Sequence, residues 1–187
     1  MKKIVLYGDS IAAGSWRGSA SDMLDKKIVH EMKLQGLSDY EIVNLGVPGA
    51  STTSALENVA KAVSEHPDIL VLNVGINDAI SILNNISEYA TNINAILEAF
   101  PTSQIIVLGP SYVDDLKKPQ AIQAIILEYN KAIAQVAIDN QCHFIDIYEL
   151  ETREGNPNIF LQEDGLHPSE FGYEMIANRI VATIATL

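Results

Sequence analysis

Residues 4–14 read IVLYGDSIAAG, a short apolar run followed directly by a glycine-bearing polar turn. Four more apolar runs follow along the chain, at Ile42–Leu45, Ile69–Val74, Ile105–Leu108 and Phe144–Ile147. These runs are rich in Ile and Val and mostly continuous rather than alternating, which is typical of parallel strands covered on both faces. The sequence therefore predicts five buried strands in one parallel sheet.

Segments of helical periodicity separate the runs, and one more follows the last run, at residues 20–35, 53–65, 87–99, 119–140 and 169–186. This alternation predicts a three-layer α/β/α fold, for which we expect the flavodoxin-like strand order 2-1-3-4-5. Because the chain has no repeat, low-complexity tract or linker, residues 1–187 are expected to form a single domain. Loops are predicted at 109–119 and 149–168.

The charge balance restricts the partners that this chain can bind. It has 187 residues, with 12 Lys plus Arg against 24 Asp plus Glu, for a net charge of −12. Nucleic acids and anionic membranes are bound through clustered Lys and Arg, so neither is expected as a partner. A neutral small molecule fits this balance better, and a homo-oligomer is left open.

The cysteine content and the apolar runs indicate where the protein works. The single cysteine, Cys142, excludes an internal disulfide and a multi-cysteine zinc site. The apolar stretch at 4–7 is shorter than the about 7–15 residues of a signal peptide, and no run approaches the roughly 20 residues of a membrane span. We therefore expect a cytoplasmic protein.

Three small polar turns follow the first three strands, at Gly8–Gly14, Asn44–Ser51 and Gly75–Asp78. In such sheets ligands bind at the carboxyl ends of the strands, where the strand order reverses, so Ser10 and Asn77 should lie close together. A serine on such a turn can act as a nucleophile. The backbone N–H groups of Ser10 and Gly49 and the Asn77 side chain could then stabilise an oxyanion.

A serine nucleophile needs a general base, and histidine suits this task near neutral pH. His30 lies in a predicted helix, whereas His66 and His143 precede strands and belong to the opposite edge of the sheet. Only His167 follows a strand's carboxyl end, and Asp164 lies three residues before it. On a tight turn this spacing can bring the carboxylate to the imidazole, which predicts a triad in the order Ser10, Asp164, His167.

Four sequence blocks carrying these residues resemble the SGNH (GDSL) hydrolases. The blocks are Gly8-Asp9-Ser10 with Ile11, Asn44-x-x-x-x-Gly49, Gly75-x-Asn77-Asp78 and Asp164-x-x-His167. The resemblance implies a three-layer α/β/α fold with Ser10 as nucleophile, His167 as base and Asp164 orienting the base. It also implies an oxyanion hole of Ser10, Gly49 and Asn77; counting from Asn44 favours Gly49 over Gly46. Within the family, the sequence is similar to compact bacterial members and isoamyl-acetate-type esterases.

The expected activity is that of a serine esterase that needs no metal or cofactor. The absence of a lid insertion favours acetyl or other short-chain esters, cleaved through an acyl-enzyme. An acyltransferase or thioesterase could use the same triad. Trp16 could line the substrate pocket, or it could simply pack on the first helix.

One alternative belongs to another class of protein. Asp9, Asp78 and Asp164 at one sheet edge could form a magnesium site, as in flavodoxin-like phosphoacceptor or phosphate-binding regulatory modules. That interpretation leaves His167 and Asn77 without a task. It also lacks a lysine in a turn after a late strand, so the esterase is favoured.

Overall fold

The five apolar runs form one parallel sheet in the computed structural model, which describes residues 1–153 and 155–187. The strand order is β2-β1-β3-β4-β5, as predicted. All four neighbouring pairs are parallel. The strands are β1 (Lys2–Gly8), β2 (Tyr40–Gly46), β3 (Ile69–Asn73), β4 (Gln104–Leu108) and β5 (His143–Ile145).

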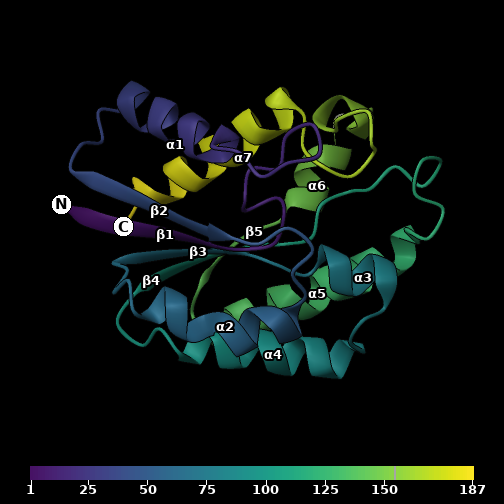
Figure 1. The fold of residues 1–187 in the computed structure, drawn as a ribbon, viewed down its shortest axis with the longest axis horizontal. Helices are drawn as coiled ribbons and strands as arrows, with labels where there is room; N and C mark the ends of the chain where they lie inside the picture. Colours follow the sequence, from purple (N-terminus) through teal and green to yellow (C-terminus); the bar gives the residue numbers. More distant parts are fainter. Residues whose placement is uncertain (154) are drawn as a thin grey trace.

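Helices cover both faces of the sheet, which completes the predicted three layers (Figure 1). One face carries α1 (Met23–Leu34) and α7 (Glu170–Ile184), and the other carries α2 (Thr52–Val63), α4 (Ile86–Glu98) and α5 (Gln123–Asp139). This double cover explains the continuous apolar runs, because both sides of each central strand face a helix. In β1, for example, Ile4, Val5 and Leu6 have no exposed surface.

Three short helical segments were not predicted from the sequence. They are α3 (Ile76–Ser81), α6 (Ile147–Thr152) and the 3-10 helix η1 (Pro157–Phe160). Each is too short to show a helical period. The predicted loop at 149–168 is therefore partly helical, whereas 109–119 contains no helix or strand, as expected.

Gly8 brings the first turn of the site close to its neighbour. The register pairs Gly8 with Asn73 at the carboxyl ends of β1 and β3. Gly8 has a φ of +146°, and a Cβ there would lie 1.9 Å from the Asn73 carbonyl oxygen. Only glycine allows this close approach, which places the turn after β1 beside the turn after β3.

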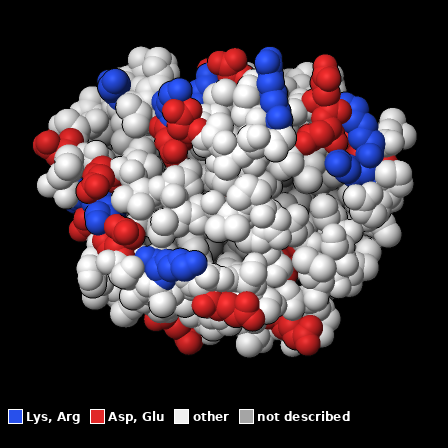
Figure 2. Space-filling model, in the orientation of Figure 1, with Lys and Arg blue, Asp and Glu red and all other residues white. Residues whose placement is uncertain are grey.

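The charged side chains are dispersed over the face of the molecule drawn in Figure 2. Basic residues there lie among acidic ones around the rim, and the centre of the face carries few charges. In the parts of the chain that the structure describes, no helix is both long enough and apolar enough to span a membrane.

Candidate active site

Ser10 lies on the turn that directly follows β1. The backbone N–H of Ala13 donates to the Asp9 carbonyl, and that of Ser15 donates to the Ser10 carbonyl, both at 2.9 Å. The Asp9 carboxylate accepts a further bond from the Ile11 N–H at 2.9 Å. These bonds fix the turn, and Ser10 is only 6% exposed.

His167 and Asp164 lie on a second tight turn, between η1 and α7. The turn closes through a bond of 2.8 Å from the Gln162 N–H to the His167 carbonyl. Asp164 Oδ1 accepts the backbone N–H groups of Leu166 and His167, each at 3.0 Å. Its other oxygen, Oδ2, lies 2.5 Å from His167 Nδ1. The three-residue spacing thus brings carboxylate and imidazole together, as the sequence suggested.

The two turns meet at the serine. His167 Nε2 lies 3.0 Å from Ser10 Oγ, across 157 residues of sequence. Partial burial would raise the pKa of the Asp164 carboxyl, but the bonds from the His167 ring and the two backbone N–H groups outweigh it and lower that pKa. Asp164 therefore stays ionised and holds Nδ1 as the protonated nitrogen, which leaves Nε2 to accept from the serine hydroxyl.

Free hydrogen-bond donors converge on the same cavity. The backbone N–H groups of Ser10 and Gly49 have no acceptor among the described residues. The Asn77 amide gives one hydrogen to the Ala50 carbonyl at 2.9 Å and keeps the other. Ser10, Gly49, Asn77 and His167 all line this cavity of about 250 Å³.

The structure also distinguishes the two glycines of the second block. The Gly46 N–H donates to Asn44 Oδ1 at 2.9 Å, so it is not available to a ligand. A Cβ at Gly46 would lie 2.3 Å from the Ala13 nitrogen, which makes this glycine a packing residue. Gly49 has a φ of +81° and open space where its Cβ would be, so a ligand can approach its backbone.

Two buried carboxylates connect the turns beneath the cavity. Burial raises the pKa of Asp9 to about 7, and hydrogen bonds from backbone N–H groups oppose this shift only in part. Asp78 accepts from the Thr52 N–H at 2.9 Å, the Thr52 hydroxyl at 2.7 Å and the Asn84 amide at 2.6 Å. Asp78 thereby ties α3, which carries Asn77, to the start of α2.

The magnesium-site alternative gains no support from this arrangement. Asp9 and Asp78 are fully buried and bind protein donors, while Asp164 pairs with His167. Within residues 1–153 and 155–187, no three His, Cys, Asp or Glu side chains are grouped so as to hold a metal ion.

Sequence reasoning missed Gln162, which joins the two turns of the site. Its Nε2 donates to the carbonyls of Ser15 and Pro168, both at 2.9 Å, and its Oε1 accepts the Arg17 N–H at 2.9 Å. No motif marks this glutamine, because the bonds depend on segments almost 150 residues apart. Trp16, the proposed pocket residue, is half-buried; it packs against the core and lines a groove beside Asp164 rather than the Ser10 cavity.

The site combines a serine, a histidine and a carboxylate in hydrogen-bonded series at the carboxyl edge of a parallel α/β sheet. This arrangement is that of the serine-hydrolase class. The sequence matches the GDSL-like Lipase/Acylhydrolase family over residues 6–175. The chain belongs to this family and is a carboxylic ester hydrolase.

Known proteins similar to this chain include both esterases and acylhydrolases. An isoamyl acetate-hydrolyzing esterase of Schizosaccharomyces pombe is 28% identical over 124 residues, which cover 63% of this chain and only half of the yeast protein. The crystal structure of a lipase/acylhydrolase from Enterococcus faecalis superposes with a TM-score of 0.94 at 32% identity, covering 98% of this chain and 95% of the other. An acetyl xylan esterase, AlAXEase, shares the fold with a TM-score of 0.78 at 21% identity, covering 97% and 99% of the two chains.

Proposed function

We propose that the protein is a serine esterase that cleaves acetyl and other short-chain esters through an acyl-enzyme. The observation that carries this proposal is the series of contacts from Ser10 Oγ to His167 Nε2 at 3.0 Å and from His167 Nδ1 to Asp164 Oδ2 at 2.5 Å. A histidine within hydrogen-bond reach of the serine hydroxyl, with a carboxylate on its other ring nitrogen, supports nucleophilic catalysis by Ser10.

In the first half-reaction, Ser10 Oγ attacks the ester carbonyl while its proton passes to His167 Nε2. Asp164 stabilises the imidazolium that forms, and the imidazolium then protonates the departing alcohol oxygen. Water attacks the acyl-enzyme in the second half-reaction, with His167 again as the base. The side chains of His167 and Asp164 are 20% and 39% exposed, so water can reach this site, which favours hydrolysis over acyl transfer.

The oxyanion of each tetrahedral intermediate would lie among the N–H groups of Ser10 and Gly49 and the free hydrogen of the Asn77 amide. These donors are held in place before the substrate arrives, because Asn77 is anchored on Ala50. Donors preorganised in this way stabilise the transition state without reorganisation.

A short acyl group is supported by the dimensions of the site and by its relatives. The cavity at Ser10 measures about 250 Å³, which favours a small acyl group beside the nucleophile. The similar proteins described above include an isoamyl acetate esterase and an acetyl xylan esterase, both named for acetate esters. The expected cytoplasmic location stays a prediction.

A series of p-nitrophenyl esters with acyl chains from acetyl to octanoyl tests the chain-length proposal. We expect kcat/KM to be highest for the acetyl to butyryl esters and to fall for longer chains. An increase in kcat/KM up to octanoyl would contradict a short acyl site. The Ser19→Ala variant, which alters an exposed serine of the same loop, is the matched control and should reproduce the wild-type series.

A further inference from the structure

A groove of about 700 Å³ lies beside the triad and is larger than the cavity at Ser10. Trp16 and Arg17 line one side, and Leu161, Gln162, Glu163 and Asp164 line the other. Gly18 borders both the groove and the cavity that holds Ser10. The groove therefore adjoins the reacting centre on the side of the His167–Asp164 pair.

Arg17 stands at the tip of a tight hairpin that forms this groove. Trp16 and Ser19 exchange backbone bonds, with N···O distances of 2.8 and 3.2 Å. The two residues between them, Arg17 and Gly18, have φ values of +51° and +85°. Two-residue turns with both central residues left-handed favour Asn, Asp or Gly, so arginine is strained at this position. Strained backbone of this kind clusters at active sites and ligand clamps.

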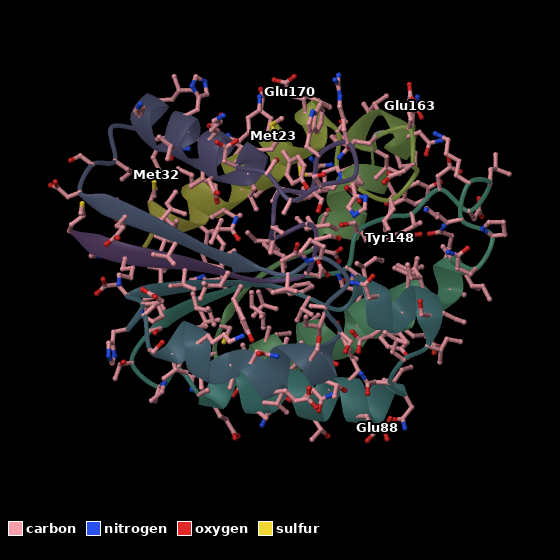
Figure 3. The ribbon with its side chains drawn as sticks, viewed as in Figure 1. Met23, Met32, Glu88, Tyr148, Glu163 and Glu170 are labelled. Atoms are coloured by element: carbon pink, nitrogen blue, oxygen red, sulfur yellow. The ribbon has the colours of Figure 1, made fainter. Side chains whose placement is uncertain are left out.

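Most polar side chains of the groove already form hydrogen bonds within the protein, and two do not. The Gln162 amide makes the three bonds given above, and the Ser169 hydroxyl donates to the Ile159 carbonyl at 2.8 Å. In contrast, neither the Arg17 guanidinium nor the Glu163 carboxylate has a hydrogen-bond or ion-pair partner among the described residues. Glu163 projects outward from the segment that leads into α7 (Figure 3).

The chemistry of these free groups indicates the kind of ligand. The Arg17 guanidinium lies 5.8 Å from the centre of the Trp16 ring. The groove therefore offers a ligand an aromatic surface and a planar hydrogen-bond donor side by side. Trp16 offers apolar area, Arg17 donates to oxygen, and the Glu163 carboxylate accepts from hydroxyl groups. Glu163 and Asp164 together outweigh the one positive charge, which disfavours an anionic ligand. A neutral alcohol rich in hydroxyl or ester oxygens meets all of these conditions.

We propose that this groove binds the alcohol portion of the ester, and that this alcohol is a sugar or similar polyol. The inference rests on the proposed esterase function, in which His167 protonates the departing alcohol. The alcohol must then lie on the imidazole side of Ser10, where the groove is, and the acyl group lies toward the oxyanion donors. Trp16 and Arg17 determine which alcohol is accepted.

A comparison of two acetate esters tests the inference. Acetate release is measured for peracetylated xylose and for ethyl acetate, and the ratio of their kcat/KM values is compared between wild type, Arg17→Asn and Trp16→Ala. Arg17→Asn should lower the ratio about tenfold, the effect expected for one lost hydrogen bond to the substrate. Its Tm should not fall, because asparagine adopts the left-handed conformation more readily than arginine. Trp16→Ala should lower the ratio as well.

The Arg179→Asn variant is the matched control, because it removes an exposed arginine from α7 and should leave the ratio unchanged. Equal losses on both esters in Arg17→Asn, an unchanged ratio, or a fall in Tm that accompanies the loss would overturn the inference. Two other outcomes would contradict the proposed esterase function itself. In the first, the wild type hydrolyses neither ester; in the second, the Ser10→Ala variant hydrolyses ethyl acetate at the wild-type rate.

Discussion

The two edges of the sheet are built from similar residues but differ in what they leave unpaired. At the amino edge, polar groups pair with one another. The Lys3 N–H donates to the Asp68 carboxylate at 2.7 Å, the Lys3 ammonium contacts Glu65 at 3.0 Å, and the Ser103 hydroxyl donates to the Pro67 carbonyl at 2.7 Å. At the carboxyl edge, Ser10, Gly49 and Asn77 line a cavity. Their two backbone N–H groups and one hydrogen of the Asn77 amide have no acceptor among the described residues.

The difference shows where this molecule uses its polar turns for stability and where it keeps them for a ligand. The polar groups described at the amino edge bond to one another and lie away from the cavity. Changes there should therefore affect folding but not catalysis. The carboxyl edge holds donors and a strained hairpin in place through the buried Asp78 and the half-buried Gln162. Changes in its cavity should affect catalysis more than folding.

The largest effect is expected for Ser10→Ala. Without the nucleophile, kcat for p-nitrophenyl acetate should fall by roughly 10⁴-fold or more, as in other serine hydrolases. The Tm should stay close to that of wild type, because His167 is the one hydrogen-bond partner of this hydroxyl among the described residues. The exposed Ser19 of the same loop, changed to Ala, provides the control. A Ser10→Ala enzyme with substantial turnover would mean that the carboxyl edge is not the reacting centre.

Next in size is the effect of Asn77→Ala, which removes one oxyanion donor. We expect kcat to fall about 10²–10³-fold, the usual cost of losing one such donor. The matched control is Asn58→Ala. This exposed asparagine lies on α2, and within the described part of the chain its amide bonds to the Ser54 carbonyl alone. If both variants lose activity equally, or if Asn77→Ala keeps the wild-type kcat, Asn77 is not part of the oxyanion hole.

Asp9, a buried residue of the carboxyl edge, should make the stability of the protein depend on pH. Burial raises its pKa to about 7, whereas an unfolded aspartate titrates near pH 3.9. The native state therefore retains a proton that the unfolded chain releases. The contribution of Asp9 to stability is complete below about pH 4, declines as the pH rises, and is lost above about pH 7.

The Asp9→Asn variant removes this titration. The difference in unfolding free energy between wild type and Asp9→Asn should change by a few kcal/mol between about pH 4 and 8, since one pKa unit corresponds to about 1.4 kcal/mol. Urea unfolding at a series of pH values measures it. Glu151, whose pKa burial raises to about 8, titrates in both proteins and cancels in the difference. A constant difference across this range would show that Asp9 is ionised throughout.

The smallest effect is expected at the amino edge. Asp68→Ala removes the acceptor of the Lys3 N–H and should lower the unfolding free energy by about 1 kcal/mol. Its kcat and KM should equal those of wild type. A loss of activity without a loss of stability in this variant would contradict the claim that the amino edge serves folding and not catalysis.

The sequence was sufficient for the fold because the decisive signals are local and repeated. Five apolar runs and five long helical periods predicted the layers and the strand order, which the structure confirms. The short helices α3 and α6 escaped prediction because six residues do not define a period. Turn motifs likewise predicted which site residues to examine, and the structure places Ser10, Gly49, Asn77 and His167 around one cavity.

What the sequence could not show are the contacts between distant segments. The bonds of Gln162 and the groove formed by Trp16 and Arg17 against Glu163 depend on three-dimensional packing. The charge balance of the sequence favoured a neutral small molecule as partner, and the structure places Arg17, unpaired among the described residues, at the border of the site. One unpaired arginine agrees with a neutral ester that carries oxygen acceptors.

Labelling with a fluorophosphonate probe tests the central claim most directly, because the probe reacts with a serine only when a base activates it. Peptide mapping after stoichiometric reaction should find the label on Ser10, and the His167→Ala variant should label far more slowly while keeping its fold. Labelling of another serine, or labelling of Ser10 at an unchanged rate in His167→Ala, would contradict the triad of Ser10, Asp164 and His167.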